Sequence, residues 1–182
     1  MMILLFLTGC ASDMVDQAKY EPLEVSPFFA DERSARTLVE HTIARDAFIE
    51  DQSIASGRME DGDLVEEIPL EITIEFLEEG RKNYDVYCSP CHGFDGFGEG
   101  MIVRRGFSAP PSFHAERLQQ APAGHFFEVI TNGFGQMFSY AYRIPVSDRW
   151  AVVAYIRALQ LSQNASPEDI PSEQLPQMQR GD

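Results

Sequence analysis

The sequence is short of cysteine, of positive charge and of long apolar runs. Its 182 residues include three cysteines and one tryptophan, and 14 basic residues stand against 29 acidic ones, for a formal net charge of −15. Such a surface repels phosphate groups, which argues against nucleic-acid binding. The chain has no internal repeat, and no stretch alternates apolar and polar residues strongly enough to predict a strand. The lack of a strand pattern favours a helical protein.

The acidic excess has two explanations. Solubility alone accounts for most acidic proteins, and a basic protein partner is the more specific alternative. A hydrophobic content of 44% and an aromatic content of 11% are enough for a core. The length suits one domain of ordinary size with some chain left over.

The N-terminus resembles an export signal. The apolar run from Ile3 to Leu7 is too short to span a bilayer and lies where the hydrophobic region of a signal peptide would be, although no Lys or Arg precedes it. The ending Leu-Thr-Gly-Cys10 resembles the lipobox of bacterial lipoproteins. This resemblance implies that residues 1–9 are removed and that Cys10 carries the lipid anchor.

The strongest helical pattern begins at Thr73, which is a suitable N-cap, with Glu75 in the first turn where the helix dipole favours an acid. Apolar residues then recur every three or four positions, so this helix is expected to end at Cys88. Gly80 inside it costs roughly 1 kcal/mol relative to Ala. Its presence indicates that another helix approaches closely there.

Two more helices are predicted, over residues 123–131 and over residues 148–161, the latter with Ser147 as its N-cap. One face of the last helix carries the apolar residues Trp150, Val153, Ala154, Ala158 and Leu161. Residues 31–50, taken alone, favour a short amphipathic helix. Residues 51–71 read as an acidic linker and residues 162–182 as a flexible, proline-containing tail.

The most informative motif is CSPCH, residues 88–92, followed by a glycine-rich run. A thioredoxin-like redox pair expects a βαβ neighbourhood, which is not predicted. A structural zinc site needs further ligands, yet the only other cysteine is Cys10 and the downstream histidines are far apart in the sequence. Cys-x-x-Cys-His is the attachment motif of c-type haem.

The motif therefore predicts one covalently bound haem c. Cys88 and Cys91 form thioethers with the two vinyl groups, and His92 is held where its ring nitrogen binds the iron as the proximal ligand. One lipid and two thioethers then account for all three cysteines.

The expected distal iron ligand is Met137, in the glycine-flanked stretch NGFGQMFSYA. The alternative for Met137 is a buried core methionine. Met101, which extended chain brings within reach, and His114 and His125 are the other candidates. His114 is expected in a surface loop, His125 at a helix start, and His41 in solvent.

Two further contacts with the haem site are expected. The carbonyl of Pro110 or Pro111 is a candidate acceptor for the free ring nitrogen of His92, which would fix the imidazole plane. Arg104 and Arg105 are candidates to neutralise the haem propionates, although solvated arginines are the commoner case.

Residues 73–161 resemble the class I cytochromes c. Gly80, Tyr84 and Cys88 look like the first helix of that family, and Trp150, Tyr155 and Leu159 look like its last helix, which crosses the first. The resemblance implies an all-α fold whose core is supplied in large part by the haem.

The flanks resemble a narrower family, the monohaem cytochrome c subunit, ActE, of bacterial alternative complex III. The residues that carry this resemblance are YEPLEVSPFFADERSAR, GMIVRRGFSAPPSFHAERL, GHFFEVITNGFGQM and DRWAVVAYIRALQLSQNA. It implies a lipid-anchored subunit on the periplasmic face that passes electrons from quinol, through iron–sulfur and multihaem subunits, to a periplasmic cytochrome or a terminal oxidase. Residues 10–72 are then expected to form a mostly extended docking arm.

Two other functions remain open from the sequence. A free-standing, lipid-tethered cytochrome that shuttles between complexes would need a tether but not an arm with apolar patches. Peroxidase-like catalysis would need an open iron position, so an unperturbed six-coordinate spectrum would exclude it.

Lipidation of Cys10 is directly testable. Mass spectrometry of the mature N-terminus is expected to find a cysteine that bears acyl chains. An N-terminal Met1, or a Cys10 without acyl groups, would contradict this prediction.

Overall fold

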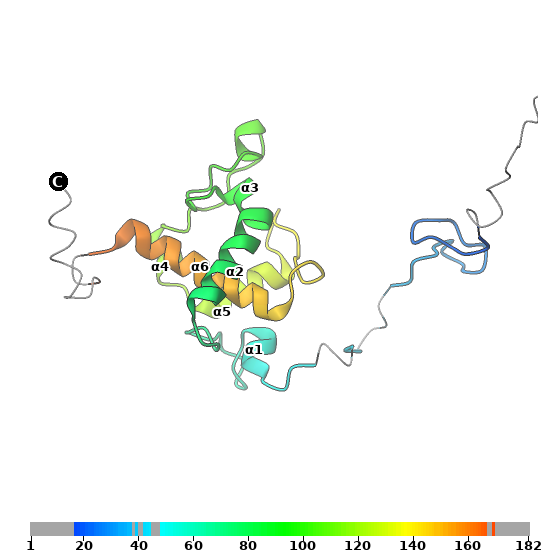
Figure 1. Ribbon diagram of the computed structural model, residues 1–182, viewed down its shortest axis with the longest axis horizontal. Coiled ribbons are helices and arrows are strands. Elements are labelled where there is room, and N and C mark those ends of the chain that lie inside the picture. Colours follow the sequence, from blue (N-terminus) through cyan, green and yellow to red (C-terminus); the bar gives the residue numbers. More distant parts are fainter. Residues whose placement is uncertain (1–16, 38, 40–41, 45–47, 167–168, 170–182) are drawn as a thin grey trace, which may run out of the picture. The chain divides into compact units, whose positions relative to one another are not determined.

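All regular secondary structure in the described part of the chain is helical, as the sequence predicts. The computed structural model describes residues 17–37, 39, 42–44, 48–166 and 169, in two units divided between Phe48 and Ile49 (Figure 1). Within these residues only three isolated β-bridges occur and no strand forms. The helices, in chain order, are α1 (Gln52–Ser56), α2 (Ile74–Asn83), the π-helix η2 (Tyr84–Cys88), α3 (Ser89–His92), the 3-10 helix η3 (Val103–Arg105), α4 (Glu116–Gln119), α5 (Ala123–Asn132) and α6 (Val146–Asn164).

Helices α2 and α6 cross in direct contact, with Gly80 at the crossing (Figure 1). A Cβ atom on Gly80 would lie 2.0 Å from the carbonyl oxygen of Ala151, so only glycine allows this approach. One turn further along, the rings of Tyr84 and Tyr155 meet with centroids 5.2 Å apart. Thr73 caps α2 as predicted, since its hydroxyl accepts a hydrogen bond from the amide of Phe76 at 3.2 Å.

Helix α5 completes the core against α6. The fully buried rings of Phe127 and Trp150 stack with centroids 4.3 Å apart. Helix α5 ends at Asn132, before Gly133, as expected. Helix α6 begins at Val146, so Pro145 rather than Ser147 is its N-cap, and it continues past residue 161 to Asn164.

The buried face of α6 differs from the predicted one at its end. Leu161 is 54% exposed, whereas Val152, Ile156 and Gln160 are buried. Since α5 and the segment before α4 both pack against this helix, burial extends round more than one apolar stripe.

Residues 51–71 are not the linker that the sequence predicts. The indole N–H of Trp150 donates to the carbonyl of Ile54 at 2.8 Å, and Val65 is buried in the core. The amide of Gly124 donates to the Val65 carbonyl at 2.8 Å, and Arg58 pairs with Glu128 at 2.6 Å. Backbone hydrogen bonds and apolar burial together fix this segment on α5 and α6, so the compact unit begins near residue 49 rather than at Thr73.

The N-terminal unit contains a folded turn where an extended arm was expected. Val25 and Arg33 form an antiparallel bridge, and the amide of Ser26 donates to the carbonyl of Glu32 at 3.0 Å. Arg36 pairs with Asp31 at 2.7 Å and lies 4.0 Å over the ring of Phe29.

The amphipathic helix predicted over residues 31–50 is absent from the described part of that range. Glu32 has a φ of 54°, in the left-handed region that a helix cannot contain, and the side chain of Arg36 is held by the turn.

Several predictions fall outside the described residues. They concern residues 1–9, Cys10, His41, and most of the tail, of which residues 162–164 belong to α6. In the residues that the structure does describe, no helix combines the length and apolarity needed to cross a bilayer.

The helix crossing predicts the effect of Gly80→Ala. Ala is favoured over Gly inside a helix by roughly 1 kcal/mol, but the added methyl group must displace the Ala151 backbone, and overpacking of this kind costs about 1–3 kcal/mol. We expect net destabilisation, measured as a lower Tm of the holoprotein. The matched control is Glu78→Ala, an exposed site on the same helix, which should leave the Tm equal or higher. An unchanged Tm for Gly80→Ala would contradict the crossing.

Candidate haem site

The attachment motif lies at the end of one continuous helical path from Ile74 to His92. The path passes from α2 through the π-helix η2 into α3, and the Ser89 hydroxyl donates to the Asp85 carbonyl at 2.8 Å across that junction. Single π-turns inside α-helices are frequent at functional sites. Because Cys88 and Cys91 are three residues apart on a helical turn, both thiols lie on the same side of the chain.

Both thiols are free, and the Cys88 thiol is buried. Burial, together with the nearby Cys91 and Asp85, raises the pKa of Cys88 to about 12. Since the thiolate is the form that binds zinc and exchanges disulfides, this environment does not favour either function. No group of three or more His, Cys, Asp or Glu side chains in the described residues is placed to hold a metal ion.

His92 is held as a neutral, unpaired imidazole. Burial lowers its pKa to about 4, and its ring stacks on Phe113 with centroids 4.5 Å apart and planes 8° from parallel. Its Nδ1 atom is buried without a hydrogen-bond partner. A neutral ring nitrogen with a free lone pair is what an iron ligand requires. The residues present therefore fit a haem bound by thioethers at Cys88 and Cys91.

The hydrogen bond expected between His92 and a proline carbonyl is not formed. The carbonyl of Pro110 is instead turned against Gly98, where a Cβ atom would approach it to 2.5 Å, and Pro111 makes no bond to the ring. Phe113, two residues further on, takes the place beside the imidazole. The ring plane is thus set by stacking in this structure.

The glycine-rich run after the motif folds back onto the motif itself. The amides of Gly98, Gly100 and Ile102 donate to the carbonyls of His92, Cys91 and Pro90 at 2.8, 3.0 and 2.9 Å. A Cβ atom on Gly100 would lie 2.2 Å from the Pro90 carbonyl oxygen, which explains why glycine is needed at this position. These bonds give the motif a rigid backbone support.

Met137 is half-buried and packs against the core, whereas Met101 is 55% exposed. The loop around Met137 is closed by two backbone bonds with Phe134, of 2.9 and 3.0 Å. Gly133 has a φ of 81°, and a Cβ atom there would meet the Met137 carbonyl oxygen at 2.5 Å. Met137 is thus better shielded from solvent than Met101, and its coordination of iron remains a prediction.

Tyr140 links this loop to the attachment motif. Its ring meets that of Tyr87 with centroids 6.1 Å apart. Burial and the nearby thiols of Cys88 and Cys91 raise the pKa of its hydroxyl. The Met137 loop and the two cysteines therefore lie in the same part of the domain.

The other histidines have different surroundings. His114 lies in a turn, as expected, and is half-buried there: its Nε2 lies 2.7 Å from the Asp95 carbonyl and its ring packs on Phe97. His125 lies in the first turn of α5, where burial and the neighbouring Arg117 lower its pKa. Arg104 and Arg105, the candidates for the propionates, are exposed on η3.

The structure adds residues that sequence reasoning missed. The buried hydroxyl of Tyr84 donates to the carbonyl of Gly93 at 2.7 Å and so fastens the residue after His92. The side-chain amide of Gln160 donates to the Phe113 carbonyl at 2.7 Å, which ties α6 to the residue that stacks on His92. In the sequence, the one sign of such a role was the hydroxyl of Tyr84 on an otherwise apolar helix face.

The comparison with protein families agrees with this site. Residues 75–156 match the model of the family described as cytochrome c oxidase, cbb3-type, subunit III. This stretch is a cytochrome c domain, and its helices, without strands in the described residues, are consistent with the class I cytochrome c fold. Such a domain implies covalently bound haem c and electron transfer.

One similar solved structure is the reducing HAO-like protein complex of Kuenenia stuttgartiensis. The match has 24% identity and a TM-score of 0.43, and covers 54% of this chain and 50% of the other. The chain thus spans about half the length of that solved chain. No curated protein matches the sequence.

The Met137 loop leads to a spectroscopic prediction. In Met137→Ala the weak near-infrared sulfur-to-iron band of the oxidised protein is expected to disappear, and the midpoint potential to fall, because a thioether ligand stabilises ferrous iron. Met101→Ala is the matched control and should retain both. If the band survives in Met137→Ala and is lost in Met101→Ala, the assignment is wrong.

Proposed function

We propose that this protein is a monohaem electron-transfer cytochrome with His92 and Met137 as its axial ligands. The observation that carries the proposal is the state of His92, which is half-buried and neutral, with no hydrogen bond to its ring, directly after two free cysteines. A neutral imidazole whose ring forms no hydrogen bond has a lone pair available for iron.

The chain's own residues would perform three tasks. Cys88 and Cys91 would hold the porphyrin through thioethers, and Tyr84 and the amides of the glycine-rich run hold the backbone of the motif. Phe113 fixes the plane of the His92 ring. The haem, when bound, supplies the one-electron couple. A Met137 thioether would favour the reduced form and close the sixth position, which disfavours peroxidase chemistry.

We further propose that the cytochrome is a lipid-anchored subunit of a membrane-bound, quinol-oxidising complex of the alternative complex III type, on the periplasmic face. Multihaem and iron–sulfur subunits of that complex would be its electron donors, and a periplasmic cytochrome or a terminal oxidase its acceptor. The resemblance of the flanking sequences and the lipobox at Cys10 support this assignment. A free-standing, lipid-tethered shuttle is the alternative.

The structure of the N-terminal unit bears on the choice between a subunit of a complex and a free-standing shuttle. Residues 20–36 form a turn with its own bridge, ion pair and cation–π contact, and Phe28 and Leu23 are exposed on it. A shuttle would need only a flexible tether here. A folded turn with exposed apolar residues is better suited to binding another subunit.

Deletion of residues 11–48 tests the subunit assignment. This change removes the turn but leaves residues 49–72, which pack on α5 and α6, so haem content and the visible spectrum should be unchanged. After extraction in mild detergent, we expect the full-length protein to co-migrate with a large multihaem complex and the shortened protein to migrate alone.

Two results would count against this assignment. A full-length protein that migrates alone would favour the shuttle, and a shortened protein that still assembles would show that the turn is not the docking element. Deletion of residues 11–72 is the comparison that should impair folding, because it removes Ile54 and Val65 from the core.

A further inference from the structure

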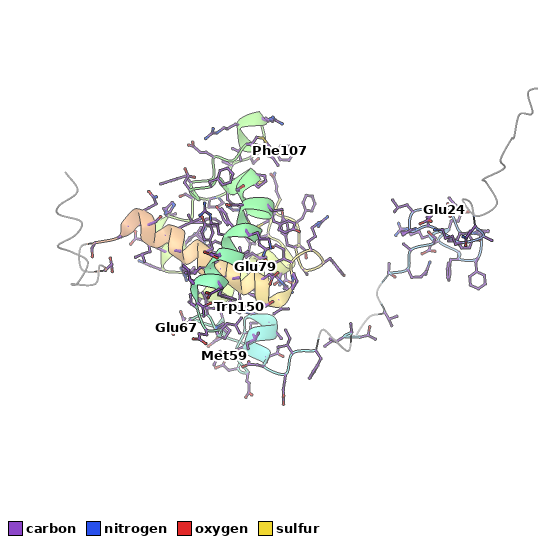
Figure 2. All side chains as sticks on the ribbon, in the orientation of Figure 1. Glu24, Met59, Glu67, Glu79, Phe107 and Trp150 are labelled. Carbon is purple, nitrogen blue, oxygen red and sulfur yellow. The ribbon has the colours of Figure 1, made fainter. Side chains whose placement is uncertain are left out.

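The segment Met101–Phe107, here called the tip, forms an ordered turn with apolar and positively charged side chains. Its backbone is closed by hydrogen bonds from the amides of Arg104 to Gly100 (3.1 Å), Arg105 to Ile102 (3.1 Å) and Gly106 to Val103 (2.9 Å). Figure 1 shows this segment projecting beyond α3, and Figure 2 labels Phe107 on it. The tip is therefore a defined surface of the domain.

Large apolar side chains on the tip face solvent. Met101 is 55% exposed and Phe107 is 69% exposed. Gly106 has no neighbouring atom within 4 Å of the position of a Cβ atom, so nothing else in the described chain covers this side of the turn. Aromatic residues, Met and Arg are the types enriched in protein interfaces.

The charge of the tip is opposite to that of the protein. Residues 100–115 contain no Asp or Glu, although the whole chain has a formal net charge of −15. Arg104 and Arg105 are exposed and make no ion pair or side-chain hydrogen bond with the described residues. By contrast, Arg58 and Arg81, on other parts of the same domain, are paired with carboxylates. The tip is thus a local positive patch.

The base of the tip is fastened to the attachment motif. The amides of Gly100 and Ile102, at the two sides of Met101, donate to the carbonyls of Cys91 and Pro90. A protein bound to the tip would consequently lie next to the edge at which the thioethers form. Electron transfer to a partner protein requires a short distance between the partner and that edge, whereas a purely structural contact does not.

We propose that the tip is a docking surface for an acidic patch on a redox partner protein. An extended anionic membrane is the less suitable occupant, because Asp95 and Glu99, which precede the tip in the chain, would be repelled by a continuous negative plane. An acidic patch of limited size on a partner protein could contact the tip without facing Asp95 and Glu99. The remaining acidic surface would repel the same partner, so the patch would orient it as well as attract it. This inference rests on the electron-transfer function proposed above.

The test is stopped-flow electron transfer from the reduced, full-chain holoprotein, each event passing one electron to the Cu(II) of an oxidised blue-copper protein that carries an acidic patch. In Arg104→Gln/Arg105→Gln the second-order rate at low salt should fall about tenfold, and the difference should vanish at high salt. With a basic cytochrome c as the oxidant, the rate should not fall. Phe107→Ser should also slow the reaction with the blue-copper protein.

The matched control is Arg117→Gln/Arg143→Gln, which removes the same charge from two exposed arginines outside the tip. It should leave the rate within about twofold of the native value. An equal loss in this control, or an unchanged rate in the tip variant, would overturn the proposal.

Two other measurements assign the tip to different roles. A shift of the midpoint potential in the tip variant would place the arginines at the haem propionates. Arginine-dependent binding to vesicles of phosphatidylglycerol, compared with phosphatidylcholine, would indicate a membrane contact. Either result would overturn the docking proposal. Failure of the function itself is distinguishable, because a native protein without a c-type haem spectrum would show no transfer to either oxidant.

Discussion

The close crossing of α2 and α6 is the constraint on which the rest of the domain depends. Because Gly80 has no side chain, α2 lies directly against the Ala151 carbonyl, and this contact fixes the line along which the chain reaches Cys88 and His92. The π-turn at Tyr84–Cys88 changes the helical register just before the motif. The position of the two thiols therefore follows from helix packing and from this one local departure from α-helical geometry.

Helix α6 contacts the other parts of the domain that position the site. Gln160 binds the carbonyl of Phe113, which stacks on His92, and Tyr155 packs on Tyr84, which fastens Gly93. Near its beginning, Trp150 stacks on Phe127 and binds the carbonyl of Ile54. One long helix thus connects the attachment motif, α5 and the segment before α2. A change on its buried face is transmitted to the site through two or three side chains.

Features encoded by neighbouring residues could be predicted from the sequence. Thr73 as the cap of α2, Gly80 as the site of close approach, and the end of α5 at Asn132 all depend on local spacing. The packing of residues 49–72 could not be predicted in this way, since the bond from Trp150 to Ile54 joins residues 96 apart and leaves no local pattern. The place of Phe113 beside His92 depends likewise on Gln160. In the described part of residues 31–50 the expected helix is replaced for a different reason, because local contacts of Arg36 with Asp31 and Phe29 stabilise a turn.

The central claim is that Cys88, Cys91 and His92 form a haem attachment site, and intact-mass analysis of the denatured protein tests it most directly. Thioethers survive unfolding, whereas a haem held only by axial ligands does not. The account predicts a mature chain heavier by one haem, which stays with the protein in acidified acetone and maps to the peptide that contains Cys88 and Cys91. A chain of the unmodified mass, with both cysteines as free thiols or joined in a disulfide, would contradict it.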